Sequence, residues 1–247
     1  MTPLIGEFIG TLLLVLLGDG VVANVLLNKS KGQGGGWMVI TTGWAFAVFV
    51  GVYVVAVYSG AHVNPAVSIG LATAGLFKWS LVPGYIAAQM AGGFTGAVLV
   101  WLMYLPHWKE TPDGELKRAV FCTAPAIRCT PSNFLSELIA TFVLMFGIFM
   151  IKGAFEKVPS SAAIPIDLGA LGALPVAILV WAIGLSLGGP TGYAINPARD
   201  FAPRVAHFVL PISGKTHSDW GYSWIPVIAP IIGAALAAFT YNVMGKP

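Results

Sequence analysis

Long apolar runs separated by short polar segments dominate the hydropathy pattern of this chain. Six runs reach about 20 residues, the length that crosses a hydrocarbon core of about 30 Å. They are residues 3–27, 37–59, 83–105, 132–154, 169–187 and 222–244. Much of the charge lies in the connections at 28–36, 106–131 and 155–168. The pattern predicts six transmembrane helices joined by polar loops.

Two further segments, 60–76 and 190–208, are too polar for a full span and too apolar for a loop. Each contains an Asn-Pro-Ala motif: Asn64, Pro65 and Ala66 in the first, Asn196, Pro197 and Ala198 in the second. Asn followed by Pro is the order of a helix N-cap and a first helical residue. A helix from Pro65 to about Leu76 would be about 18 Å long, roughly half of the hydrocarbon core. We therefore expect two re-entrant half-helices that end near the middle of the membrane.

The two halves of the chain resemble each other. IGEFIGTLLL around Glu7 resembles LSELIATFVL around Glu137, and SGAHVNPAVSIG resembles TGYAINPARDFA. Each half, about 1–105 and 132–247, holds three spans and one half-helix, and residues 106–131 join them. Because three is odd, the second half must be inverted relative to the first. The sequence predicts a single all-α membrane domain over residues 1–247, with half-helices that enter from opposite faces.

Composition supports a lipid environment. Hydrophobic residues make up 57% of the chain and charged residues only 9%, against about 25% in soluble domains. The net charge of +3 is spread over loops, so we expect no nucleic-acid partner. The first apolar run has no basic region before it and no convincing cleavage site, which indicates a retained span. The scarcity of tails and targeting signals favours a bacterial inner membrane.

Irregular backbone at membrane depth is tolerated only where protein buries it or where it lines a wet cavity. The stretches ahead of the half-helices would therefore offer carbonyl oxygens to a pore: Gly60, Ala61, His62 and Val63, then Gly192, Ala194 and Ile195. Such carbonyls replace the water hydrogen bonds that a hydroxyl-bearing solute loses on entry. Asn64 and Asn196 can cap their helices and still offer N–H groups, while both positive helix N-termini repel cations. His62 either lines this pore or is a packed, hydrogen-bonded side chain.

Charged residues within the predicted membrane segments need partners. Arg199 is a functional candidate by default, with backbone carbonyls of the preceding loop as expected partners; the alternative is a side chain that reaches the interface. Asp200 and Arg204 have the i,i+4 spacing of a structural ion pair. Glu7 and Glu137 are expected to accept hydrogen bonds from backbone N–H groups of the broken segments. A proton relay is the alternative for these two carboxylates.

Two Asn-Pro-Ala motifs in six spans, with NPARD in the second, resemble the major intrinsic protein family over essentially the whole chain. This resemblance implies a homotetramer of independent pores, both termini in the cytoplasm, and neither an enzyme nor a cofactor or metal site. Glycerol channels of the family differ from water channels in three features that this chain also has. They are Asp200 after the motif arginine, Arg204 four positions later, and Pro226-Val227 in the last span. The resemblance implies passive passage of glycerol, with water and other small neutral solutes such as urea or polyols.

The narrow filter of glycerol facilitators combines Trp, Gly, an aromatic residue and Arg. By their offsets from the two motifs, these positions correspond to Trp44, Gly184, Tyr193 and Arg199. Two aromatic rings would accept the hydrocarbon edge of glycerol, and Arg199 its hydroxyls. Gly184 would supply width where water channels have His. Tyr193 replaces the Phe of the best-known glycerol facilitator, which leaves the order of glycerol, water and urea open. The alternative for Trp44 alone is an interfacial aromatic.

Three other functions fit the sequence less well. Gly184, Asp200 and Pro226-Val227 argue against a water-selective channel. A coupled transporter, which inverted repeats also build, needs a titratable or cation-binding centre, and two asparagines facing two positive helix ends are a poor one. A membrane enzyme has little support, because GKT at 214–216 lacks the glycine that a phosphate loop needs at position 209.

Two questions stay open at this level. With cytoplasmic termini, the inner loops carry fewer basic residues than the outer loops, opposite to the positive-inside rule. The inner ones are Lys78, Lys152, Lys157 and Lys246, and the outer ones Lys29, Lys31, Lys109, Lys117, Arg118, Arg128 and Lys215. We follow the family orientation. Cys122 and Cys129 are either two loop thiols or, in an oxidising compartment, a disulfide.

Overall fold

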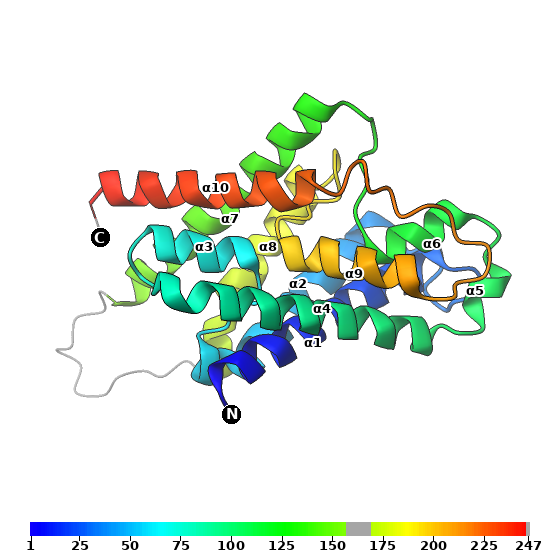
Figure 1. The fold of residues 1–247 in the computed structure, drawn as a ribbon, viewed down its shortest axis with the longest axis horizontal. Helices are drawn as coiled ribbons and strands as arrows, with labels where there is room; N and C mark the ends of the chain where they lie inside the picture. The colour runs from blue at the N-terminus through cyan, green and yellow to red at the C-terminus, as the bar shows by residue number, and fades with distance from the viewer. Residues whose placement is uncertain (157–168, 246–247) are drawn as a thin grey trace.

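The computed structural model describes residues 1–156 and 169–245, and every regular element in these ranges is a helix (Figure 1). Five stretches of the described chain are long and apolar enough to cross a membrane. They form helices α1 (Pro3–Leu26), α2 (Gly36–Ser59), α4 (Val82–Met103, after a 3₁₀ turn η1 at Trp79–Leu81), α7 (Thr130–Glu156) and α10 (Ile225–Val243). The chain is an integral membrane protein.

The span predicted at 169–187 has a shorter α-helix than expected. A 3₁₀ turn, η2 (Gly169–Ala173), leads into α8 (Leu174–Leu187), an apolar helix of 14 residues. Pro175 lies in the first turn of α8, where a residue without an N–H group is tolerated. The predicted connection at 155–168 falls largely outside the described residues, as do Lys157 and Lys246.

The connection 106–131, predicted as a polar loop, contains two short helices. These are α5 (His107–Glu110) and α6 (Gly114–Phe121), and Asp113 caps α6 by accepting a hydrogen bond from the Glu115 N–H at 2.8 Å. Trp108 stacks on Phe121 with ring centroids 5.5 Å apart, and both side chains are buried. Both rings belong to the main hydrophobic core of the bundle, so the segment is packed onto that core. Both cysteines that follow α6 are free thiols, Cys122 buried and Cys129 exposed.

The two half-helices are α3 (Pro65–Thr73) and α9 (Pro197–Val209). They lie end to end along the long axis of the molecule, with their first residues facing each other at its centre (Figure 1). Helix α3 ends before the predicted Leu76, because Gly75 takes a left-handed conformation with φ of 74° and stops it. Each half-helix packs chiefly on the last span of the other half, α3 on α10 and α9 on α4.

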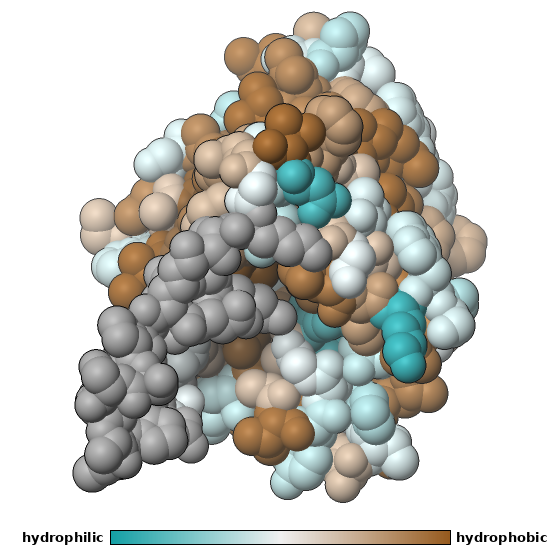
Figure 2. Space-filling model, turned by 90° about the vertical axis from the view of Figure 1, so that its left-hand side faces the viewer, coloured by the Kyte–Doolittle hydropathy of each residue, from teal (hydrophilic) through white to brown (hydrophobic). Residues whose placement is uncertain are grey.

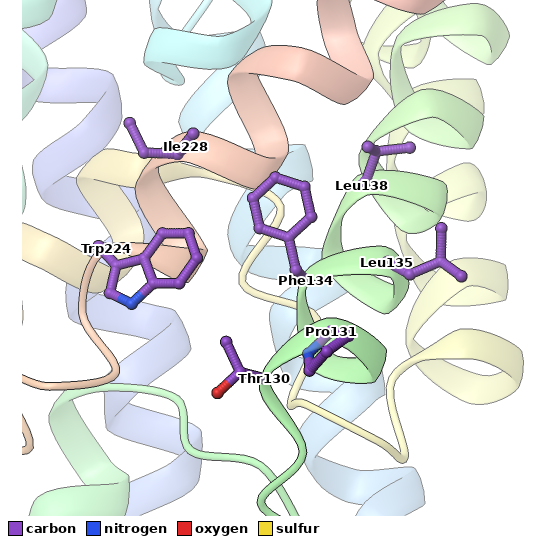
Figure 3. Close-up of a pocket in the computed structure, with 7 residues that line it drawn as sticks. All are labelled: Thr130, Pro131, Phe134, Leu135, Leu138, Trp224 and Ile228. Atoms are coloured by element: carbon purple, nitrogen blue, oxygen red, sulfur yellow. The ribbon is translucent and has the colours of Figure 1, made fainter.

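The outer surface of the bundle is apolar. Phe46, Val57, Met103 and Phe239 are all more than half exposed on the outer faces of their helices. Figure 2 views the molecule from the end at which α10 finishes, where the coloured residues are a mixture of apolar and weakly polar ones and few are strongly hydrophilic. A surface groove between the first turns of α7 and α10 is lined almost entirely by apolar side chains (Figure 3): Thr130, Pro131, Phe134, Leu135, Leu138, Trp224 and Ile228. Such a surface suits hydrocarbon and not water.

Candidate functional site

Both Asn-Pro-Ala motifs begin a half-helix in the same way. The Asn64 side-chain oxygen accepts a hydrogen bond from the Ala66 N–H at 2.9 Å, and Asn196 accepts one from Ala198 at 3.0 Å. Each asparagine has extended backbone and is followed by the motif proline as the first helical residue. The side-chain oxygen of each asparagine is therefore used by its own helix, and its NH₂ group is directed elsewhere.

The NH₂ groups join the two halves of the chain. Asn64 donates to the carbonyl of Ile195, and Asn196 donates to the carbonyl of Val63, both at 2.9 Å. Each bond therefore reaches the residue that precedes the other asparagine. Both asparagines are 5% exposed, so most of each side chain is enclosed by protein. This reciprocal pair brings two helix N-termini, each with about half a positive charge, to one point inside the bundle.

The loop ahead of α3 is held by a fully buried carboxylate from α1. Glu7 accepts hydrogen bonds from the backbone N–H groups of His62 at 2.9 Å and Val63 at 2.7 Å. The side-chain amide of Gln89 also donates to Glu7, at 2.7 Å. The donors of this irregular backbone are thus satisfied at membrane depth without water.

The loop ahead of α9 is held in the same way from α7. Glu137, also fully buried, accepts the backbone N–H groups of Ala194 and Ile195, each at 2.9 Å. Both loops contain residues other than glycine with positive φ, which is unfavourable for side chains with a Cβ. They are Ala61 (50°), Val63 (45°), Tyr193 (38°) and Ile195 (43°). The two carboxylates stabilise this strained backbone.

The His62 side chain lies among other side chains and is 7% exposed. Its Nδ1 is 3.0 Å from the Ser68 hydroxyl, and its ring lies 4.5 Å from the Phe77 ring and 4.9 Å from the Tyr85 ring, centroid to centroid. This geometry fits the packed, hydrogen-bonded interpretation of the side chain.

Arg199 and Trp44, two of the predicted filter residues, are in contact. The Arg199 guanidinium carbon lies 3.9 Å from the centroid of the Trp44 ring, a close cation–π arrangement. The Nη1 atom of Arg199 lies 3.7 Å from a carboxylate oxygen of Asp19 on α1. These two contacts take the place of the backbone carbonyls that we expected as partners. The guanidinium is enclosed in the bundle, since the Arg199 side chain is 10% exposed.

Gly184 and Tyr193, the other two predicted filter residues, are also in contact. A Cβ placed on Gly184 would lie 2.8 Å from Cζ and 2.9 Å from the hydroxyl of Tyr193, so any larger residue would displace the ring. Trp37 packs edge-on against Tyr193, with centroids 5.8 Å apart, and donates its indole N–H to the Gly184 carbonyl at 3.0 Å. The Tyr193 hydroxyl is buried beside α8. The space left by Gly184 is therefore occupied by the Tyr193 ring.

Comparison with known proteins agrees with this geometry. The family model described as "Major intrinsic protein" matches residues 1–241. The chain belongs to the major intrinsic protein family. Its sequence is 59% identical over 242 residues to a probable glycerol uptake facilitator protein of Thermotoga maritima, covering 98% of this chain and 99% of that protein. It is 54% identical over 241 residues to glycerol uptake facilitator protein 3 of Lactiplantibacillus plantarum, covering 98% and 96%.

The fold is also that of a solved structure. The X-ray structure of the aquaglyceroporin from Plasmodium falciparum matches with a TM-score of 0.81 and 32% sequence identity, covering 97% of this chain and 94% of that one. The predicted fold class, spans with two re-entrant half-helices, is confirmed. As a major intrinsic protein, the chain is a membrane channel and not an enzyme.

In this major intrinsic protein, Asp200 and Arg204 form a fully buried ion pair. Arg204 makes two-pronged contact with Asp200 at 2.8–3.1 Å and donates to the carbonyls of Thr123 at 2.9 Å and Ser218 at 2.8 Å. Asp200 in turn accepts the Thr123 N–H at 2.7 Å. The pair fixes α9 to the segments that follow α6 and precede α10. The pair therefore has the structural role that its i,i+4 spacing predicted.

Sequence reasoning missed several residues around the site, among them Asp19, Trp37 and Thr123. Asp19 had a signal, because an acidic residue in an otherwise apolar span needs a partner. Trp37 and Thr123 lie in segments far from either motif along the chain, and nothing local distinguishes them from interfacial or loop residues. Their contacts with the site come from the packing of distant elements.

Proposed function

We propose that this protein is a passive channel for glycerol and other small neutral solutes, which move down their own gradient. The observation that carries the proposal is the reciprocal pairing of Asn64 and Asn196 at two inward-facing helix N-termini. Next to it, the contacts Trp44–Arg199 and Gly184–Tyr193 bring the filter positions together in pairs. The names of the similar bacterial proteins, glycerol uptake facilitators, support glycerol as the solute.

The filter is proposed to recognise both the carbon chain and the hydroxyl groups of a polyol. The rings of Trp44 and Tyr193 offer apolar surface to the carbon chain. The Arg199 guanidinium offers N–H donors to the hydroxyl oxygens, and the Trp44 ring and Asp19 hold it in one orientation. A solute without hydroxyls would leave buried donors unpaired, at a cost of about 1–3 kcal/mol each.

Carbonyl oxygens extend this recognition along the pore. Because Glu7 and Glu137 bind N–H groups of both loops, those loops can direct carbonyls toward the lumen. The carbonyls proposed for this role belong to Gly60, Ala61 and His62 in one half and to Gly192, Tyr193 and Ala194 in the other. The carbonyls of Val63 and Ile195, predicted with them, already accept hydrogen bonds from Asn196 and Asn64. Each oxygen replaces part of the hydration that a solute loses on entry. The two halves would form one continuous path that leads from the filter past the paired asparagines.

The centre of the pore is proposed to exclude cations and protons. Both helix N-termini present positive charge there, which repels cations and hydronium but not neutral solutes. Each asparagine has one amide hydrogen bonded to the opposite loop, so its second hydrogen can bind a passing oxygen. A water molecule held by donors on both sides cannot relay a proton through this point.

Other features are proposed on the family resemblance. Water accompanies glycerol, and urea or other small polyols are further candidate solutes. Four copies form a homotetramer in which each has its own pore. The termini are cytoplasmic, in a bacterial inner membrane, so that α3 enters from inside and α9 from outside. The two similar halves, about 1–105 and 132–247, form an inverted repeat.

Transport without coupling separates this proposal from a secondary transporter. Uptake of labelled glycerol into proteoliposomes is measured with and without ionophores that abolish proton and sodium gradients. A channel gives the same initial rate in both conditions, and uptake stops when internal and external glycerol are equal. Accumulation above the external concentration, or a rate that falls with the ionophores, would favour the coupled transporter.

A further inference from the structure

Asp19 is a buried carboxylate in the membrane-spanning helix α1 whose ionic partner is Arg199. Its side chain is 0% exposed, and Nη1 of Arg199 lies 3.7 Å from its Oδ1. Within residues 1–156 and 169–245, neither Asp19 oxygen has a hydrogen-bond partner. A carboxylate without hydrogen bonds is costly to bury, and an opposite charge is what compensates it. Arg199 supplies that charge.

The neighbouring charged residue Asp200 already has an ionic partner. Asp200, which follows Arg199 and shares its surroundings, is bound by Arg204 at 2.8–3.1 Å. Asp19 and Arg199 thus form a second ion pair beside the first, one that joins α1 to the first turn of α9. The first pair anchors the half-helix. The second pair acts on the guanidinium that belongs to the filter.

The residue before Asp19 acts on the other large filter side chain. A Cβ on Gly18 would lie 2.2–2.4 Å from three atoms of the Trp44 ring, so only glycine allows the indole to pack against α1. Arg199 lies over the same indole, with its Cζ 3.9 Å from the ring centroid. Gly18 and Asp19 therefore support Trp44 and Arg199 from behind, as two consecutive residues of one helix.

We infer that Asp19 is a positioning residue of the channel: it fixes the Arg199 guanidinium against Trp44 and offsets its charge at the filter. The inference rests on the proposed assignment of Trp44 and Arg199 to the filter. Loss of the carboxylate leaves the guanidinium free to change its orientation. It also leaves an uncompensated positive charge at the proposed filter, which favours anions over neutral solutes.

The test is a double-mutant cycle in proteoliposomes with wild type, Asp19→Asn, Arg199→Ala and the double variant. Asp19→Asn keeps the shape and removes the charge. We expect it to lower the ratio of glycerol to water permeability by at least about two-fold, the lower limit for coupled neighbours, and to admit nitrate. The same substitution in the Arg199→Ala background should leave the ratio unchanged. Thr11→Val is the matched control, since Thr11 is another fully buried polar residue of α1 without a hydrogen-bond partner among the described residues.

Thermal melting of the same four proteins tests the pair independently of the solute. Arg199→Ala should melt below the double variant, because it alone leaves Asp19 unpaired in the bundle. If Asp19→Asn does not fold, the melting temperatures of Arg199→Ala and the double variant still show whether Asp19 and Arg199 are coupled. Additive effects on melting, or a wild-type permeability ratio in Asp19→Asn, would overturn the inference. A wild-type protein that conducts no glycerol but shows the melting coupling would instead overturn the proposed solute.

Discussion

Tyr193 and Gly184, two positions of the proposed filter, fit closely because Gly184 has no side chain. Tyr193 lies directly over Gly184. A Cβ added to Gly184 would lie only 2.8 Å from Cζ of the Tyr193 ring. Trp37 holds the tyrosine from another side, edge to face. The ring therefore has little freedom to move away from α8. A larger residue at position 184 would push the Tyr193 ring away from α8 and change the proposed filter.

Gly184→Ala is expected to reduce glycerol permeability several-fold and water permeability less, because the displaced ring narrows a passage that glycerol needs in full width. Gly189→Ala is the control, since a Cβ there meets no atom within 4 Å. Both permeabilities are measured by light scattering on proteoliposomes. Equal loss of water and glycerol in folded Gly184→Ala would remove Gly184 from the filter.

Burial raises the pKa of the Cys122 thiol to about 12, which keeps it protonated and unreactive over the ordinary range of pH. In a Cys129→Ser variant, labelling by iodoacetamide should stay slow from pH 7 to pH 9, and it should become rapid only after unfolding. Mass spectrometry of the native and denatured protein measures this. Rapid native labelling that rises steeply with pH would mean that the thiol is open to solvent.

The residues nearest to the motifs could be predicted from the sequence, whereas their partners were harder to predict. Asn64 and Asn196 have a local role as helix caps, and the repeat places them at equivalent points. The partners of Arg199 were predicted as backbone carbonyls, whereas the structure gives Asp19 and Trp44. Contacts between α1, α2 and α9 decide this, and no spacing along the chain encodes them.

At the scale of elements, buried carboxylates make the broken segments possible. Glu7 and Glu137 each bind two consecutive N–H groups of a loop that has no helix partner for them. Without an acceptor, those groups would be unsatisfied in a medium that contains no water. The re-entrant loops therefore depend on residues that lie 50 or more positions away along the chain.

Glu137→Gln should destabilise the protein by about 1–3 kcal/mol, because its NH₂ group would face a backbone N–H donor in a buried position. The loop ahead of α9 should loosen as well, with lower selectivity between glycerol and water. Glu110→Gln is the control, since Glu110 pairs with Lys29 at the surface, where ion pairs contribute little. An equal melting temperature for wild type and Glu137→Gln in detergent would contradict this role.

Element types could be predicted well and their ends less so. The long apolar runs became α1, α2, α4, α7 and α10 within a few residues of the predicted bounds. Helix α3 stopped early because Gly75 adopts a left-handed conformation just past its end, a local stop signal that the prediction did not use. Helices α5 and α6 were missed because they are short, and a polar composition hides the buried face around Trp108 and Phe121.

At the scale of the whole molecule, the start of α1 and the end of α10 lie in the same half of the structure, and α5 and α6 lie at the opposite end (Figure 1). This arrangement fits an even number of crossings. The distribution of Lys and Arg disagrees with the orientation proposed from the family. Chemical labelling of a residue at one end of the molecule decides which end faces the cytoplasm.

Cys129 is such a residue, because it is exposed in the segment between α6 and α7, while Cys122 is buried. If the termini are cytoplasmic, a membrane-impermeant maleimide added to intact cells should label Cys129. The Cys129→Ser variant should remain unlabelled. Labelling only in inverted vesicles would place this segment inside and agree with the positive-inside rule.

The most direct test of the account is stopped-flow light scattering on proteoliposomes that contain the wild-type protein. An inward glycerol gradient first shrinks the vesicles by loss of water, and entry of glycerol then reswells them. The account predicts reswelling much faster than in protein-free vesicles, without any ion gradient. Rapid shrinkage followed by reswelling at the protein-free rate would contradict it and indicate a water-selective channel.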